Sequence, residues 1–552
     1  MKNSLHTGGI GTGERWGYRK EKKEERSCLE SALCLVVLLI FSLILFFLLV
    51  LSATSSTAVY GGAEQVWYYS DSPFYHLFVF ILLTVGGIVV LRGFMGENSG
   101  SLRREDSKDR TVFCQWMIII SGFYIIWIMG TLLSPVSDQR LVMDSGKALV
   151  DGDLSPWNQV GFKYGYSGLE GYAYTYPHQN GQILFAALLA LIAGDHVAFL
   201  WQLLNVAFLA AGMIYTSRLA RETLELKGSR FFTIFLFVYL PFAFYFTFSY
   251  GTIPGFACSA AAVWYEWKFL TFGRKRDLFL SAISISLAIL FKSNYLIVLT
   301  AMVIFFLTDA MIKKRIFPVF GAVAVLAVYL FSHQAVSDGL SLAAGHSVKG
   351  GPPTLTWVEM GLQEGSRAPG WFNNYNVHIY LENQEDADLT RAAVEQDLAE
   401  TFRDFLEDPG YASDFFVRKI QSMWAEPTFQ SLWIQEVKGK GWLFPWFTKS
   451  LFREGGAANE IYWEMCNAVQ SMVYASAFLF VVFRIRRVRL EGLIFAVIFI
   501  GGFLFHLFWE AKGQYAVGYF ILLLPYAWIG FRDWILWFNG LLDKVHKVYT
   551  RG

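Results

Sequence analysis

The run LESALCLVVLLIFSLILFFLLVLSA, residues 29–53, decides the fold class of this chain, because it holds a single charged residue in 25 positions. A stretch of this length and polarity crosses a lipid bilayer as one helix. The basic segment RKEKKEERS before it resembles the start of a secretory signal peptide, but the apolar region of a signal peptide is shorter. We therefore predict a retained first membrane span.

The composition of the whole chain extends this prediction. Of its 552 residues, 55% are hydrophobic and only 16% are charged, whereas a soluble protein carries about a quarter charged residues. The formal net charge of +1 excludes nucleic acid as an obvious partner. The five cysteines lie in or beside apolar runs, without the spacing of a metal site or a disulfide framework. The predicted fold class is an all-α polytopic membrane protein.

Similar apolar runs recur along the chain, and basic residues alternate between the segments that connect them. Lys and Arg gather on the cytoplasmic side of membranes, so this alternation fixes the predicted topology. It gives about twelve spans, with both termini cytoplasmic and the protein in the cell membrane. The predicted spans are 29–53, 75–92, 113–134, 198–217, 231–249, 252–270, 277–292, 294–309, 316–332, 466–483, 491–508 and 514–530.

The alternation holds only if GQILFAALLALIAG, residues 181–194, does not cross the membrane. At 14 residues it is too short to span and is expected to lie as a helix in the outer interface. The acid-rich stretch DADLTRAAVEQDLAETFRDFLEDP, in a large outer segment, is predicted to be a helix that stops at Pro409. The predicted regions are a cytoplasmic tail (1–28), two N-terminal spans with their loop (29–112), a transmembrane core with first outer loop 135–197 (113–332), an extracytoplasmic, mainly α soluble segment (333–465), C-terminal spans (466–532) and a cytoplasmic interfacial tail (533–552).

Acidic residues follow the third predicted span, where SPVSDQ places Asp138 close to the membrane surface. A carboxylate partly shielded from water there is expected to have a raised pKa, which suits a general base that accepts a proton from a hydroxyl group. The simpler interpretation is a solvated acid or a helix cap, and it suits Asp151 and Asp153 best. Asp144 is six residues beyond Asp138, so the two acids do not share a face of a regular helix.

Two lysines lie on the predicted outer face, where basic residues are otherwise scarce: Lys292 in FKSN and Lys512 in FWEAKGQY. An isolated lysine at the end of a span usually snorkels to water, which is the simpler interpretation. Each has a polar neighbour, Asn294 or Glu510, and two converging ammonium groups would bind a lipid phosphate. His506, about one helical turn before Glu510, is an ionisable group inside a span and therefore a further candidate.

The first outer loop contains the motif YPHQ directly before the predicted interfacial helix. Pro177 is suited to the first turn of a helix, and the free N–H groups there, together with His178, would suit an anion. Tyr176 and Gln179 offer hydrogen bonds, although most tyrosines of this loop fit an ordinary interfacial belt better.

These patches together resemble the GT-C superfamily of membrane glycosyltransferases, and within it the bacterial proteins related to protein mannosyltransferases and aminoarabinose lipid A transferases. SPVSDQ, DGDLSPW and YPHQNGQILFAALLALIAG are similar to the first outer loop of that family. FKSNYLIVLTA, GWFNNYN, KIQSMWAEPTFQS and FLFHLFWEAKGQYAVGYFILLLPYAWIG resemble patches of a Gram-positive branch. The resemblance covers about residues 113–532 and leaves the two N-terminal spans as additions.

The resemblance implies a GT-C-like fold that transfers a sugar from a polyprenyl-phosphate donor to an extracytoplasmic glycan, lipid or protein. Asp138 corresponds to the catalytic base of the family, with Asp144 as a weaker second acid. Lys292, Lys512 and His178 are expected to bind the donor phosphate. The expected substrate-binding residues are Tyr176, Gln179, Asn294, Trp371, Asn373, Glu510 and Tyr515. For Trp371, docking of the outer segment onto the membrane domain is the simpler interpretation.

The motif SYGTIPG, residues 249–255, lacks the acid that some GT-C relatives carry in their second short outer loop. Several relatives need no metal, so no cofactor is required for certain, and the role of a divalent cation, Mg or Mn, is left open. Membrane lipids are expected partners in either case.

Three other functions fit parts of the pattern. A polyprenyl-linked lipid transporter or flippase usually has two similar halves and broken helices at the midplane, and no internal repeat is evident here. An O-antigen-ligase-like enzyme would also use a polyprenyl-linked donor, but a large arginine-rich outer loop would favour it, and this loop is mixed in charge. In a wall-assembly scaffold without catalysis, Asp138 would be dispensable.

Overall fold

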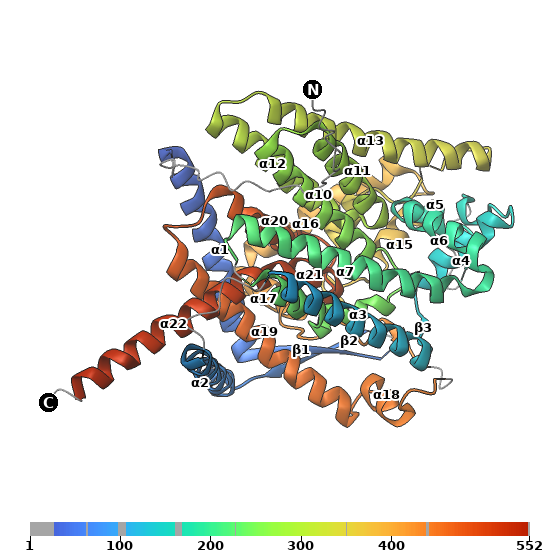
Figure 1. Ribbon diagram of the computed structural model, residues 1–552. Coiled ribbons are helices and arrows are strands. Elements are labelled where there is room, and N and C mark those ends of the chain that lie inside the picture. Colours follow the sequence, from blue (N-terminus) through green and yellow to red (C-terminus); the bar gives the residue numbers. More distant parts are fainter. Residues whose placement is uncertain are drawn as a thin grey trace, which may run out of the picture.

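The computed structural model describes residues 27–61, 64–97, 106–159, 168–226, 228–348, 350–437 and 441–549. The described chain is mostly helical, with two short antiparallel pairs of strands (Figure 1). Most of the predicted N-terminal tail (1–26) and part of the tyrosine-rich first loop (160–167) lie outside the described residues.

Nine helical stretches in the described part of the chain are long and apolar enough to cross a membrane, and a bent pair, 230–237 with 240–247, would make a tenth. This agrees with the predicted all-α polytopic membrane protein, whereas the count of twelve spans stays a prediction. Two further predicted spans form helices that are not among the nine, α10 (Thr252–Phe272) and α11 (Lys275–Phe291). The main helices of the nine stretches are α1 (Cys28–Thr54), α2 (Pro73–Glu97), α3 (Asp106–Thr131), α7 (Val197–Thr223), α12 (Leu296–Lys313), α13 (Phe317–Ala344), α19 (Ala457–Arg484), α20 (Ile494–Phe508) and α22 (Leu524–Tyr549).

Helix α1 belongs to the core of the bundle, although the resemblance left it as an addition. Leu38, Phe41 and Leu45 recur every three to four residues along one face and are fully buried. The ring centroid of Phe41 lies 5.7 Å from that of Phe499 in α20 and 5.3 Å from that of Tyr526 in α22. Burial of this face against two C-terminal helices makes the N-terminal span an integral part of the fold.

The predicted connection 54–74 is a β-hairpin, which sequence patterning missed. Strand β1 (Ser55–Tyr60) pairs antiparallel with β2 (Gln65–Ser70). The amide of Thr57 donates to the carbonyl of Ala425 over 2.9 Å, and the indole N–H of Trp433 donates to the carbonyl of Gly61, also over 2.9 Å. The hairpin is therefore bonded to the large connection near the middle of the chain.

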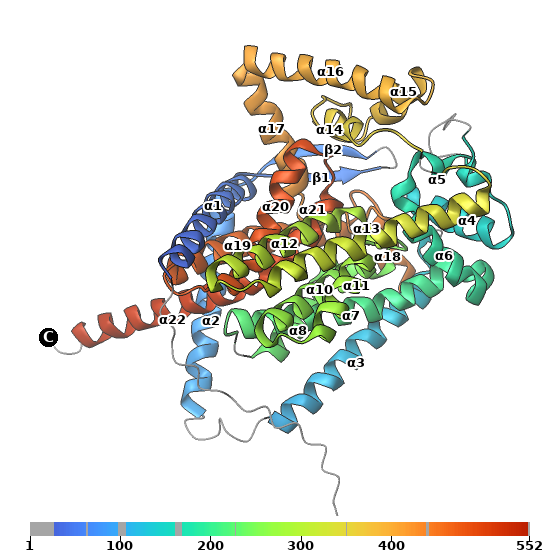
Figure 2. The same cartoon turned by 90° about the horizontal axis from the view of Figure 1, so that it is seen from above.

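That large connection forms a cap (residues 350–437), which lies with the hairpin on one side of the helix bundle (Figure 2). The segment predicted at 333–465 is shorter, because α13 continues to Ala344 and α19 begins at Ala457. The predicted acidic helix is confirmed as α16, and Pro409 ends it by starting the next helix. The elements of this region are α14 (Leu355–Met360), α15 (Tyr375–Glu382), α16 (Ala387–Glu407), α17 (Pro409–Trp424) and, after the cap, α18 (Pro445–Phe452).

The first outer loop of the prediction folds into two packed helices, α4 (Asp138–Val150) and α6 (Asn180–Ala193), with the 3₁₀ turn Pro177–Gln179 before α6. They approach closely at Gly146, where an added Cβ would lie only 2.7 Å from the backbone nitrogen of Ala187. Helix α6 coincides with the predicted interfacial helix, and Gly194, with a φ of +54°, separates it from α7. Short strand β3 (Ser134–Pro135), before α4, pairs with β4 (Gln435–Glu436) of the cap.

Candidate active site

A cavity of about 340 Å³ lies where the start of α4, the turn before α6, the cap and the loops at 248–250, 292–297 and 505–515 meet. Its volume is within the range of pockets that hold small ligands. Nine of the twelve residues predicted for the site line this cavity, so the structure brings together motifs that are far apart in sequence. They are Asp138, Tyr176, His178, Gln179, Lys292, Asn294, Glu510, Lys512 and Tyr515.

Asp138 is the first residue of α4, directly after Ser137, whose φ of +51° turns the chain away from strand β3. Burial raises the pKa of the Asp138 carboxyl above its usual value, the ammonium of Lys512 opposes this shift, and the carboxylate of Glu64 reinforces it. A carboxylate that is desolvated yet lines an open cavity is a stronger base than an exposed one. Its position in the cavity wall and its raised pKa therefore make Asp138 chemically suited to accept a proton from a group bound in the cavity.

The two predicted lysines line the same cavity. The ammonium of Lys292 donates to the hydroxyl of Thr252 over 3.0 Å and lies 5.2 Å from the ring centroid of Tyr515. The ammonium of Lys512 lies 2.9 Å from a carboxylate oxygen of Glu64. Burial disfavours the charge on Lys512, but the carboxylates of Glu64 and Glu510 outweigh it and raise the pKa of Lys512. A buried, protonated lysine at a cavity wall is suited to bind an anion.

Glu510 and Tyr515 form the wall beside Lys512. The Tyr515 hydroxyl donates to Glu510 Oε2 over 3.3 Å, and its ring stacks on that of buried His506 with centroids 5.7 Å apart. Burial raises the pKa of Glu510 to about 7, although Lys512 opposes the shift. The cavity thus holds, besides Asp138, a second carboxyl group whose pKa is raised by burial.

A tight turn explains why the motifs SYGTIPG and FKSN lie together. The amide of Gly251 donates to Gln182 Oε1 over 2.7 Å, and Gln182 in turn donates to Gln179 Oε1 over 2.6 Å. A Cβ at Gly251 would collide with the carbonyl oxygen of Phe291, the residue before Lys292. The backbone at residue 251 therefore sets the position of the Lys292 loop.

Replacing Gly251 with alanine is expected to destabilise the protein by about 1–3 kcal/mol, because the added methyl group must push the Phe291 carbonyl away. The measurement is the midpoint of thermal unfolding of the purified protein. Gly339→Ala in α13 is the matched control: no atom lies within 4 Å of the added Cβ, so its midpoint stays the same or rises. Equal midpoints for wild type and Gly251→Ala would contradict the close packing of this turn.

Three predicted site residues do not line the cavity, among them Asp144, which lies farther along α4. The indole N–H of Trp371 donates to the hydroxyl of Ser422 over 2.8 Å, and its backbone bridges to Ala511, so it docks the cap onto the C-terminal helices. Asn373 uses its side chain to bond Gln363 and the amide of Tyr375, both inside the cap. The catalytic role predicted for Asp144 and the substrate-binding roles predicted for Trp371 and Asn373 therefore gain no support from the lining of this cavity and stay predictions.

Several residues of the site were missed by sequence reasoning. Trp357 from α14 and Trp509 after α20 stack with an interplanar angle of 5° and centroids 6.2 Å apart, and both line the cavity. The ammonium of Lys419 in α17 donates to the carbonyls of Gly361, Leu507 and Trp509, which fixes the cap over the end of α20. Nothing in the local sequence marks Trp357 or Lys419, because their partners are distant in the chain.

The residues around the cavity do not form a recognisable metal site. In the part of the chain that the structure describes, no group of three or more His, Cys, Asp and Glu side chains could hold a metal ion. The carboxylates of Asp138, Glu64 and Glu510 all act on the ammonium of Lys512. These carboxylates surround a protein cation, the Lys512 ammonium, and a role of a divalent metal stays a prediction.

Comparisons of the chain with protein-family models, with curated proteins and with solved structures found no match.

Proposed function

We propose that this protein is a membrane glycosyltransferase that moves a sugar from a polyprenyl-phosphate donor to a hydroxyl group of an acceptor. The observation that carries the proposal is one cavity with a half-buried carboxylate, Asp138, and two ammonium groups, Lys292 and Lys512, in its wall. Base and cations are the two groups that this reaction needs, one for the attacking oxygen and the others for the leaving phosphate.

In the proposed reaction, Asp138 accepts the proton of the acceptor hydroxyl while that oxygen bonds to the anomeric carbon of the donor sugar. The bond between the anomeric carbon and the phosphate oxygen breaks, and its electron pair leaves with the polyprenyl phosphate. Lys512 and Lys292 neutralise the charge that develops on this oxygen, so the leaving group needs no proton. Attack opposite to the leaving group inverts the anomeric centre, as the resemblance to the GT-C superfamily implies.

A second pocket supports a lipid-linked donor. It shares Lys292, Asn294 and Tyr515 with the cavity and continues between α10 and α12, where apolar residues such as Phe256 and Val298 line it. A donor whose phosphate lies at Lys292 would direct its isoprenoid chain into these apolar surroundings. A soluble nucleotide sugar has no apolar chain that would contact these residues.

The proposal is tested with membranes that contain or lack the protein, incubated with a panel of radiolabelled polyprenyl-phosphate sugars. The expected result is transfer of label to a membrane or envelope acceptor, together with release of free polyprenyl phosphate, only where the protein is present. Movement of the intact labelled lipid between leaflets without transfer would favour a flippase instead. Transfer of whole glycans but of no single sugar would favour an O-antigen-ligase-like enzyme.

A further inference from the structure

Glu64 connects three parts of the fold that are distant in sequence. It lies in the turn of the N-terminal hairpin, with a φ of +55°, and only 3% of its surface is exposed. One carboxylate oxygen lies 2.9 Å from the ammonium of Lys512, and the other accepts a hydrogen bond of 2.9 Å from the guanidinium of Arg367 in the cap. Arg367 also donates to the carbonyl of Phe372, which lines the cavity.

The Glu64–Lys512 pair fixes a charge that the cavity uses. Lys512 lines the cavity, whereas Glu64 contacts it from behind and does not itself line the wall. The ring of Trp433 limits the ammonium on another side, with the nitrogen 5.6 Å from the ring centroid. An ammonium has three N–H groups, so one bond to Glu64 leaves donors free for an anion in the cavity. A buried cation of this kind needs a fixed counter-ion to remain charged and in place.

We infer that Glu64 is a positioning residue of this site. Its carboxylate keeps the Lys512 ammonium charged and directed at the phosphate of a lipid-linked ligand, and the guanidinium of Arg367 keeps the Glu64 carboxylate in place. The inference rests on the proposed function in one respect, the phosphate that Lys512 binds. It makes the N-terminal hairpin, which lies outside the stretch resembling GT-C enzymes, a working part of the site.

The inference has a pH signature that a loss of folding would not produce. The groups that act on Lys512 are the carboxylates of Glu64, Glu510 and Asp138, together with the second cation, Lys292. Glu64 is the largest of the influences that raise the pKa of Lys512, and burial opposes it. Without Glu64 the pKa of Lys512 falls, so its charge is kept at acid pH and is lost earlier as the pH rises.

The test measures binding of polyprenyl phosphate without sugar to the purified full-length protein, through the fluorescence of tryptophans at the cavity. Glu64→Gln is expected to raise the Kd about tenfold relative to wild type at about pH 8.5, and to leave it within about twofold at about pH 6. Glu64 also acts on the pKa of Asp138 and Glu510, and Lys512 acts on the charge of Lys292, so the same comparison is made in the Lys512→Met background. There the pH-dependent effect of Glu64→Gln should disappear, which assigns it to Lys512.

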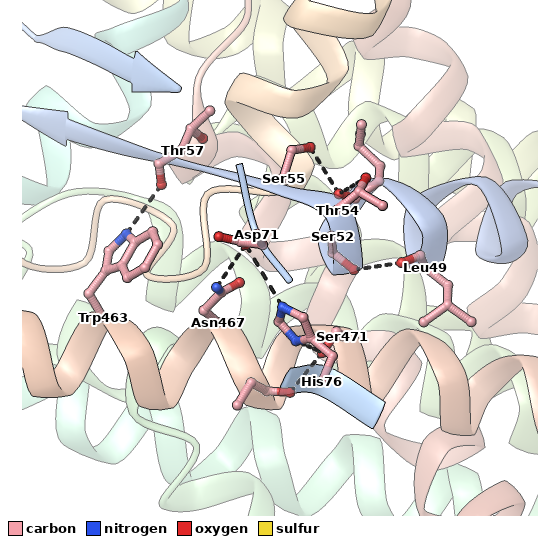
Figure 3. Close-up of polar contacts among 12 residues, drawn as sticks. Leu49, Ser52, Thr54, Ser55, Thr57, Asp71, His76, Trp463, Asn467 and Ser471 are labelled. Atoms are coloured by element: carbon pink, nitrogen blue, oxygen red, sulfur yellow. Dashed lines mark hydrogen bonds and ion pairs between the residues drawn. The ribbon is translucent and has the colours of Figure 1, made fainter. Parts of the chain in front are cut away.

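Asp71→Asn is the matched control, because Asp71 is an acid of the same hairpin that lies at its base, directly after β2, whereas Glu64 lies in the turn at the other end. It accepts a 2.9 Å hydrogen bond from Asn467 and lies 3.8 Å from His76, which bonds Ser471, away from the cavity (Figure 3). If loosening the hairpin were the cause, Asp71→Asn would weaken binding at both pH values. The inference expects its Kd to match wild type at both.

The outcomes separate the inference from the proposed function. If wild type binds polyprenyl phosphate and Glu64→Gln binds it equally well at both pH values, the positioning role is wrong and the proposed function stands. If wild type does not bind polyprenyl phosphate at all, both the positioning role of Glu64 and the proposed function are wrong. Should Glu64→Gln not fold, Glu64→Asp carries the test, because it keeps the charge but shortens its reach. A smaller rise in Kd, again at alkaline pH only, is then expected.

Discussion

Replacing Asp138 with asparagine is expected to lower the rate of sugar transfer by about 10²–10⁴-fold, the range that a positioned general base contributes. Asparagine has nearly the shape of aspartate, so the start of α4 and the cavity should be kept. Its amide cannot accept the proton of the acceptor hydroxyl. Binding of polyprenyl phosphate should persist, because the cations are unchanged and one opposing negative charge is gone. A fall in kcat with an unchanged or lower KM for the donor is the expected pattern.

The measurement is the initial rate of transfer at saturating donor, with the amounts of the two proteins in the membrane matched. Asp195→Asn is a suitable control, since this acid belongs to the same predicted loop but its side chain is 94% exposed and pairs with Lys147. Its rate should equal that of wild type. Full activity of Asp138→Asn combined with loss in Glu510→Gln would move the base to Glu510, whose pKa of about 7 also suits the task.

The helices of this protein could be predicted from sequence because each depends on its own residues. The run at 29–53 is apolar without interruption and became α1, Cys28–Thr54, with ends within one residue of the prediction. The span predicted at 231–249 coincides with the bent pair at 230–247, but its bend was missed, as was the pairing of β1 with β2, and both for a physical reason. A bend or a strand pair is fixed by the residues that pack against it, and the local sequence pattern does not show these tertiary contacts.

The candidate site shows the same division. The lysines and acids stood out because charge is costly at the edge of a membrane, so Lys292, Lys512 and Glu510 could be named from sequence alone. Glu64 could not, since nothing in the letters GGAEQ marks it, and only the fold brings its carboxylate to Lys512. Trp371 is the opposite case, because its contacts agree with the docking interpretation and not with substrate binding. Its motif was conspicuous, but its indole bonds Ser422 within the cap interface and does not line the cavity.

Replacing Lys512 with methionine is expected to reduce kcat by about 10²–10³-fold, the cost of removing one preorganised group that stabilises a developing negative charge. The single variant also has a structural cost, because Glu64 then remains buried with Arg367 as its remaining ion-pair partner. Breaking a buried ion pair from one side costs about 3–5 kcal/mol. A loss of activity in this variant alone would therefore not distinguish missing chemistry from partial unfolding.

The double variant Glu64→Gln/Lys512→Met resolves this ambiguity, because it removes both charges of the pair and leaves similar volumes in their place. Arg367 loses its counter-ion in this variant, but the amide oxygen of the introduced glutamine can still accept its hydrogen bond, and the Arg367 side chain is 23% exposed and so keeps contact with water. Its midpoint of thermal unfolding should return toward wild type, whereas its kcat should stay as low as that of Lys512→Met. The two substitutions should thus be non-additive in rate, since Glu64 acts on transfer through Lys512. A double variant with a restored midpoint and wild-type kcat would show that Lys512 stabilises the fold and not the leaving phosphate.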